Sequence, residues 1–258
     1  MKNKQQILAA NWKMNLTSIE IKAFFQNIEN EKATFDKLQC FIAPSPVYLN
    51  LLQHEKESRN LTIECIAQNL HWEDSGAFTG EISPKQLLDI GVTGSLIGHS
   101  ERRQYFSESN VIILNKCLKA LSHDLHIILC VGESLEERES NLTNDVLKKQ
   151  LEPILSTLCD QFKSHTIMNR LTIAYEPVWA IGTGKSASTT QIEETHQYIH
   201  SLLSDYKLNS CSILYGGSVK PANYSEIYAL DAVDGALVGG ASLDPKSFLE
   251  LAKIMISN

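Results

Sequence analysis

Short apolar runs alternate along the chain with longer segments whose hydrophobic residues recur at helical spacing. Runs of four to eight apolar residues are typical of buried strands, and a period of about 3.6 residues is typical of helices packed on one face. We expect strands at 6–11, 38–43, 61–68, 95–98, 126–131, 171–175, 212–215 and 235–238, with helices between them, for example at 18–29, 111–121, 143–158 and 191–206. Asp244 and Pro245 form a start signal for a last helix that runs to about residue 256.

This alternation of strand and helix predicts an α/β fold in which a parallel sheet closes as a (β/α)8 barrel. An open doubly wound sheet is the alternative, but no G-x-G-x-x-G motif follows the first strand. The composition does not change along the chain, and no linker rich in proline, glycine or serine divides it. We therefore expect a single domain over residues 1–258.

Composition narrows the class of protein. The chain has 258 residues, of which 43% are hydrophobic and 21% are charged, and its net charge is −7. An acidic chain without basic tracts is a poor candidate for binding nucleic acid or an anionic membrane. No run approaches the ~20 apolar residues of a membrane span, and the amino terminus does not resemble a signal peptide. We expect a cytoplasmic protein.

The six cysteines are scattered and include no C-x-x-C pair. Four of them, Cys40, Cys65, Cys130 and Cys211, fall in apolar runs typical of strands. Small apolar core residues are the interpretation that this placement favours, and a disulfide framework is not expected in a reducing compartment.

In a barrel of this kind the reactive side chains collect where strands end and helices begin. Those positions hold polar residues and glycines: Asn11, Lys13, Gln68, Asn69, His99, Glu101, Glu133, Glu176, Gly216, Gly217, Ser218, Gly239 and Gly240. The barrel prediction therefore brings a rim of chemically useful residues to one end of the molecule.

The segment AYEPVWAIGTGK, residues 174–185, is the most informative part of that rim. Glu176 stands at the end of a predicted strand, and Pro177 favours an extended exit from it. Gly182 and Gly184 allow close backbone approach to a ligand. The segment is typical of a carboxylate base beside a mobile cover that holds an anion, although a lone Glu-Pro is more often an ordinary loop with a surface glutamate.

Paired glycines at the ends of the last two strands predict a phosphate site. Gly216-Gly217-Ser218 and Gly239-Gly240 can present backbone N–H groups to an anion, and barrels commonly bind phosphate after strands seven and eight. One such pair alone would be better interpreted as a tight turn. Two pairs in adjacent positions, with Gly182, favour the phosphate site.

His99 and Lys13 supply the remaining chemistry. A helix begins after His99, and its positive end favours a neutral imidazole that donates a hydrogen bond to a carbonyl. Lys13 offers a fixed positive charge, and Glu101 can pair with it, although Arg102 and Arg103 suggest plain surface ion pairs equally well. A structural histidine and a solvated lysine are the alternatives.

Together these groups indicate proton abstraction next to the carbonyl of a small phosphorylated substrate, under a lid that excludes water. No spacing of histidines and acids is typical of a metal site. We therefore expect no metal site.

Seven motifs, in order, resemble those of the triosephosphate isomerase family. They are NWKMN (11–15), GAFTGE (76–81), GHSERR (98–103), CVGE (130–133), the segment 174–185, YGGSV (215–219) and VGGASL (238–243). The resemblance covers residues 8 to 254. A departure from the family pattern is Ala10, where many relatives have glycine before the asparagine.

The resemblance implies a TIM barrel that interconverts dihydroxyacetone phosphate and glyceraldehyde 3-phosphate without cofactor or metal. It implies that Glu176 is the base, with His99 as the neutral electrophile and Lys13 as the catalytic cation. The substrate-binding residues that it implies are Asn11, Lys13, Gly182, Ser218, Gly239 and Gly240. It further implies a homodimer in which the loop Gly76–Glu81 reaches the neighbour's active site, with Thr79 near the partner's Asn11 or Lys13.

Two other functions remain open on the sequence. A Schiff-base aldolase is a phosphate-binding barrel of similar size, but it requires a buried lysine of lowered pKa. A catalytically silent scaffold is the second, and the presence of Lys13, His99 and Glu176 argues against it.

Overall fold

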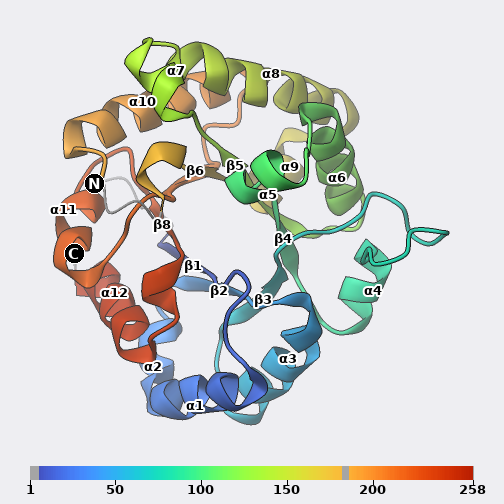
Figure 1. The fold of residues 1–258 in the computed structure, drawn as a ribbon, viewed down its shortest axis with the longest axis vertical. Coiled ribbons are helices and arrows are strands. Elements are labelled where there is room, and N and C mark those ends of the chain that lie inside the picture. Colours follow the sequence, from blue (N-terminus) through green and yellow to red (C-terminus); the bar gives the residue numbers. More distant parts are fainter. Residues whose placement is uncertain (1–5, 182–185, 258) are drawn as a thin grey trace.

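The barrel that the sequence predicts is present in the structure, a computed structural model that describes residues 6–181 and 186–257. Neighbours in sequence are neighbours in the sheet, and β8 returns to β1, so the sheet is closed (Figure 1). The strands are β1 (Ile7–Asn11), β2 (Gln39–Ala43), β3 (Glu64–Ala67), β4 (Gly94–Ile97), β5 (His126–Val131), β6 (Leu171–Tyr175), β7 (Ser212–Tyr215) and β8 (Gly235–Val238).

All strand pairs are parallel. Leu8 of β1 lies beside Cys40 of β2 on one side and, in the pair that closes the sheet, beside Ala236 of β8 on the other. A closed parallel sheet brings the carboxyl ends of all its strands to one rim. The open doubly wound alternative is therefore wrong, and the predicted rim exists.

Helices surround the strands as an outer ring (Figure 1). They are α1 (Ser18–Ile28), α2 (Lys32–Phe35), α3 (Leu49–Ser58), α4 (Pro84–Asp89), α5 (Ser100–Tyr105), α6 (Asn110–Ser122), α7 (Leu135–Glu139), α8 (Thr143–Gln161), α9 (Ser164–Arg170), α10 (Thr189–Asp205), α11 (Pro221–Tyr228) and α12 (Pro245–Ser257). Single 3₁₀ turns are η1 (Glu29–Glu31), η2 (Pro46–Tyr48), η3 (Val178–Ala180) and η4 (Gly240–Ser242).

Each strand is buried on both faces, which explains why it is a continuous apolar run and not an alternating one. In β1, Ile7 and Ala9 belong to the cluster inside the barrel, whereas Leu8 and Ala10 pack against the helices. The same alternation carries the inner cluster around the barrel through Phe41, Ile66, Leu96, Ile128, Ala174, Leu214 and Leu237. Ala10 is fully buried in the outer layer.

Strand ends differ from the prediction where buried residues lie outside the hydrogen-bonded ladder. Leu61 and Ile63 are buried, but the ladder between β2 and β3 begins only at Phe41 and Glu64. A hydrophobic run shows which residues are buried, whereas the bounds of a strand depend on its hydrogen bonds to a neighbouring strand. The predicted strand 61–68 is therefore too long.

Helix starts follow the capping chemistry of the sequence. Asp244 Oδ2 accepts the N–H of Ser247, and α12 begins at Pro245 as predicted. Ser188 caps α10 by accepting the N–H of Gln191 at 3.2 Å. Such caps satisfy N–H groups that the first turn of a helix leaves without partners.

The four cysteines that we expected in the core are buried, and all six are free thiols. Burial raises the pKa of the Cys65 thiol to about 12, and the Cys211 thiol behaves in the same way. No helix in the described ranges combines the length and the apolar character that crossing a bilayer requires.

His126, at the start of β5, is a buried base at the end of the barrel opposite the rim. Its ring lies 4.8 Å from that of Phe41 between centroids, and its Nε2 is 3.0 Å from Oγ1 of Thr172. Burial, with a smaller contribution from the charge of Arg170, lowers its pKa to about 4. A charged imidazole is thus incompatible with this packing.

We predict that His126 makes folding sensitive to mild acid. The unfolded chain binds a proton near pH 6.5 and the folded chain only near pH 4. The residue's contribution is therefore intact above pH 6.5 and is lost as the pH falls toward 4, with about 2 kcal/mol lost at pH 5. Urea unfolding of wild type and His126→Asn at pH 7.5 and pH 5 should show a smaller pH effect in the variant.

The exposed His54 supplies the control, since His54→Asn should retain the wild-type pH dependence. Equal pH dependence in His126→Asn and wild type would show that burial of His126 does not couple folding to pH.

Candidate active site

Most of the predicted site residues line one cavity of about 290 Å³ at the carboxyl ends of the strands. Its walls include Asn11, Lys13, His99 and Glu176, which come from β1, β4 and β6 or the loops that follow them. The predicted phosphate-binding residues after β7 and β8 also belong to the lining: Gly216, Gly217, Ser218, Gly239 and Gly240. Gly182 lies outside the described residues.

Two glycines let the backbone of Glu176 sit between neighbouring strand ends. The Glu176 N–H donates to the carbonyl of Val131 at 2.7 Å, which continues the ladder between β5 and β6. A Cβ on Gly132 would lie 1.7 Å from the Glu176 carbonyl oxygen, and one on Gly216 would lie 2.9 Å from Glu176 Cγ. Side chains at either position would displace the carboxylate.

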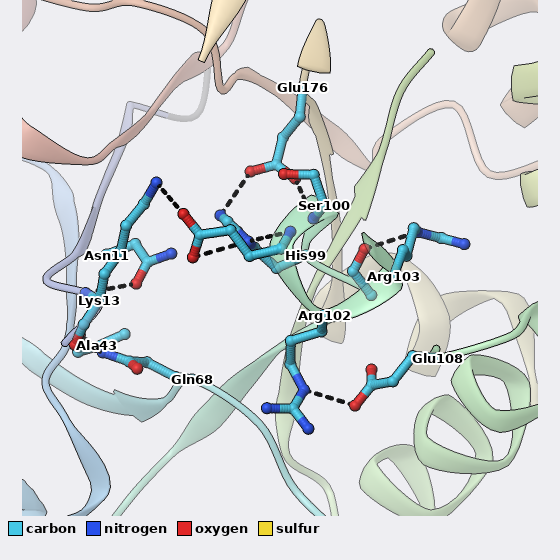
Figure 2. A network of polar contacts seen from close by, with 12 residues as sticks. Asn11, Lys13, Ala43, Gln68, His99, Ser100, Arg102, Arg103, Glu108 and Glu176 are labelled. Atoms are coloured by element: carbon cyan, nitrogen blue, oxygen red, sulfur yellow. Dashed lines mark hydrogen bonds and ion pairs between the residues drawn. The ribbon is translucent and has the colours of Figure 1, made fainter. Parts of the chain in front are cut away.

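The Glu176 carboxylate is only 2% exposed and contacts two nitrogen atoms (Figure 2). Oε2 accepts the backbone N–H of Ser100 at 3.0 Å, and Oε1 lies 3.0 Å from Nε2 of His99. Burial raises the pKa of Glu176, but His99, the Ser100 N–H and Lys13 together lower it below its ordinary value. The group is thus an ionised carboxylate at neutral pH although it is shielded from water.

His99 is 5% exposed and is the N-cap of α5. Its Nδ1 accepts the N–H of Glu101 at 3.2 Å, so the neutral ring carries its proton on Nε2, which faces Glu176. Burial lowers the pKa of His99, while the carboxylates of Glu176 and Glu101 raise it, and the net direction is upward. Because an accepting Nδ1 has no room for a second proton, we assign the neutral tautomer to this arrangement.

Lys13 has a left-handed backbone, with φ of 51°. For a residue other than glycine this conformation costs about 1–2 kcal/mol. Three hydrogen bonds hold it: the Lys13 N–H donates to Asn11 Oδ1, and the Lys13 carbonyl accepts from Ser45 Oγ and Gln68 Nε2. Asn11 therefore positions Lys13 in addition to lining the cavity.

The Lys13 ammonium pairs with Glu101 at 2.6 Å, which is the partner that the sequence suggested. The neighbouring arginines have other partners. Arg102 pairs with Glu108, and Arg103 donates to the Gly98 carbonyl and to Asn110 Oδ1. Arg103 is therefore a structural residue of the strand ends, and the surface ion pair that we considered for it is wrong.

The glycines after β8 leave open space above the backbone. A Cβ on Gly240 would meet nothing within 4 Å, and one on Gly239 would meet only the end of the Lys13 side chain, with Cε at 3.6 Å. Gly240 also begins the turn η4, and an N–H group in the first turn has no acceptor within the helix. An anion in the cavity can approach these N–H groups and the Lys13 ammonium together.

Three further residues were not assigned roles from the sequence. Ser100 contributes a backbone N–H, which no side-chain pattern reveals. Gln68 donates to the carbonyls of Lys13 and Ala43 and was noted only for its place at a strand end.

Glu133, also noted only for its position, is fully buried beneath the segment that follows β6. It accepts from Tyr175 Oη and Trp179 Nε1, each at 3.0 Å, and its backbone carbonyl accepts the N–H of Val178. These bonds fix the start of the segment 178–181 beside the cavity. Within the described part of the chain, His, Cys, Asp and Glu side chains do not gather in threes that could hold a metal ion.

Comparison with known proteins identifies the family of this chain. The family model described as Triosephosphate isomerase matches residues 6–255. A Triosephosphate isomerase of Finegoldia magna is 42% identical over 252 residues, which cover 96% of this chain and 98% of that protein. Proteins of the same name from Clostridium botulinum and Pelodictyon phaeoclathratiforme are 44% and 41% identical over 94% and 97% of this chain, and 96% and 98% of their own lengths. The chain belongs to the triosephosphate isomerase family and is an isomerase.

Proposed function

We propose that this chain interconverts dihydroxyacetone phosphate and glyceraldehyde 3-phosphate through an enediol(ate) intermediate. The observation that carries the proposal is the buried pair formed by Glu176 and His99, 3.0 Å apart, which opens into the cavity shared with Lys13. The reaction moves one proton between neighbouring carbons and redistributes electrons within the substrate, so the side chains at hand suffice. Membership in the family supports the substrate.

Glu176 is the base in this proposal. In the structure its two donors, Ser100 and His99, lower its pKa and make it a weak base, while burial alone would raise the pKa. Rotation of the carboxylate away from the Ser100 N–H and over the substrate removes those donors and keeps the group out of water. The same movement therefore brings the base to the carbon and strengthens it.

His99 and Lys13 stabilise the charge that develops on the substrate oxygens. With its Nδ1 held by the Glu101 N–H, His99 presents an Nε2 proton that can be donated to each of two neighbouring oxygens in turn. Lys13 lines the same cavity and adds a positive charge. Because these donors are already in position before the reaction, they stabilise the enediolate without having to move.

The phosphate group binds the N–H groups near Ser218, Gly239 and Gly240, and the segment around Gly182 covers it. Glu133 supports this lid at its amino-terminal end through Trp179. A lid has a chemical purpose, because a phosphorylated enediolate that meets water and has freedom to rotate loses its phosphate. Asn11 contacts substrate and holds the Lys13 backbone.

The ion pair of Lys13 counts against the Schiff-base alternative. A lysine nucleophile must be neutral, whereas the Lys13 ammonium lies 2.6 Å from the Glu101 carboxylate. A scaffold without activity would have no need of the buried pair of Glu176 and His99, which costs desolvation energy to keep.

We also propose that the active protein is a homodimer. The loop Gly76–Glu81 projects from the ring of helices between β3 and α4 (Figure 1), and Phe78 and Thr79 at its tip are exposed. A second cavity, of about 580 Å³, opens beside Lys13 and His99, and its walls include the exposed Met14, Tyr105 and Phe106. A partner's loop inserted there would cover apolar surface and bring Thr79 near Lys13.

Turnover should depend on the length of the side chain at residue 176. Glu176→Asp keeps the charge but retracts the carboxylate by one methylene, so we expect kcat to fall about 10²-fold or more with little change in KM. The measurement is isomerisation of glyceraldehyde 3-phosphate coupled to NADH oxidation.

Glu226→Asp, an exposed change on α11, is the matched control and should be silent. Near-normal turnover in Glu176→Asp would remove Glu176 from the role of base. A folded wild-type protein with no turnover would overturn the isomerase assignment itself.

Sedimentation should show a particle of twice the 28.8 kDa chain mass. Met14 is 93% exposed, so Met14→Glu should not disturb the fold of one chain but should place a charge in the contact. We expect the variant to dissociate at micromolar concentration and to lose activity in parallel. Val111→Glu, on α6 and 68% exposed, should remain dimeric. A wild-type monomer with full activity would contradict the homodimer.

A further inference from the structure

Lys220 is a second cation in the wall of the active-site cavity, and the reaction as proposed above does not use it. It follows β7 and lines the cavity together with Ser218, Gly239 and Gly240, on the side assigned to phosphate. The side chain is exposed. Among the residues that the structure describes, the other lysine in the wall is Lys13, which follows β1.

The backbone of Lys220 is fixed, whereas its ammonium remains available. The Lys220 N–H donates to Asn223 Oδ1 at 2.8 Å, while Asn223 Nδ2 donates back to the carbonyl of Ser218. These bonds tie Lys220 to the phosphate-binding turn and do not involve its side chain. In the described ranges, 6–181 and 186–257, no carboxylate forms an ion pair with Lys220.

The charges around the cavity indicate that Lys220 offsets negative charge at the site. The protein carries a net charge of −7, and a phosphate monoester is close to a dianion at neutral pH. Lys13 is already paired with Glu101, and Glu176 is ionised. Without Lys220, the charges of Lys13, Glu101 and Glu176 would add up to an excess negative charge facing an anionic substrate. With Lys220, the positive charges balance the negative ones.

We propose that Lys220 attracts the phosphate group of the substrate into the cavity and helps to hold it there. This inference rests on the proposed function, since it names a residue that binds the phosphate of the same substrate. The position of the lysine at the phosphate end predicts an effect on binding and on the rate of capture, and not on proton transfer. Lys220 would therefore raise kcat/KM through KM.

Inorganic phosphate is a suitable probe, because its binding can be measured without turnover. We compare wild type, Lys220→Gln, Lys220→Arg and the control Lys37→Gln by calorimetric titration with phosphate at low salt. Lys37 is an exposed lysine that precedes β2, at the end of the barrel opposite the cavity, so its replacement changes the net charge equally. Steady-state kinetics with glyceraldehyde 3-phosphate follow on the same four proteins.

We expect Lys220→Gln to weaken phosphate binding and to raise KM about three- to tenfold with kcat unchanged. Lys220→Arg should retain wild-type values, and Lys37→Gln should be silent. The difference between Lys220→Gln and wild type should shrink as salt approaches ~0.5 M, because salt screens exposed charges.

Wild-type phosphate affinity and KM in Lys220→Gln would overturn the inference, and so would an equal loss in Lys37→Gln, which would reflect net charge alone. The experiments distinguish failure of the role of Lys220 from failure of the proposed function. A protein that isomerises normally with Lys220→Gln refutes the role of Lys220 and leaves the proposed function intact. A protein that shows no isomerase activity, but loses phosphate affinity in Lys220→Gln, refutes the function and keeps the anion site.

Discussion

The contact between the Glu176 carboxylate, the ring of His99 and the N–H of Ser100 is the interaction around which this barrel is organised. A carboxylate that is 2% exposed can remain ionised only if donors replace the water it has lost. The donors come from the end of β4 and the start of α5, and the acceptor comes from the end of β6. Closure of the sheet is what places these ends together.

Small backbone features make that contact possible. Gly132 and Gly216 let the Glu176 backbone pass between its neighbours, and the Glu101 N–H fixes the proton of His99 on the nitrogen that faces the cavity. After β1, Asn11 and Gln68 hold Lys13 in a left-handed backbone conformation that is unfavourable for a residue other than glycine. The hydrogen bonds that stabilise these backbone conformations therefore also position the reacting side chains.

The sequence predicts most of this architecture because both faces of each strand are buried and the helices are capped by side chains. Strands β5 to β8 have the predicted bounds, whereas β3 is shorter because burial of Leu61 and Ile63 does not require pairing. The side chains of the site were found from their place after strands. The Ser100 N–H could not be found that way, since every residue except proline offers one. The roles of Glu133 and Lys220 were not predicted either, since they depend on what the fold places around these residues.

The most direct test of the account is isomerisation in D₂O, followed by NMR of the product together with Glu176→Gln. A proton that passes through a carboxylate can exchange with solvent, so the account predicts deuterium on the reacting carbon of the wild-type product. It also predicts that Glu176→Gln loses both isomerisation and deuterium uptake while it still binds inorganic phosphate. Deuterium uptake at the wild-type rate in a folded Glu176→Gln protein would show that another group removes the proton.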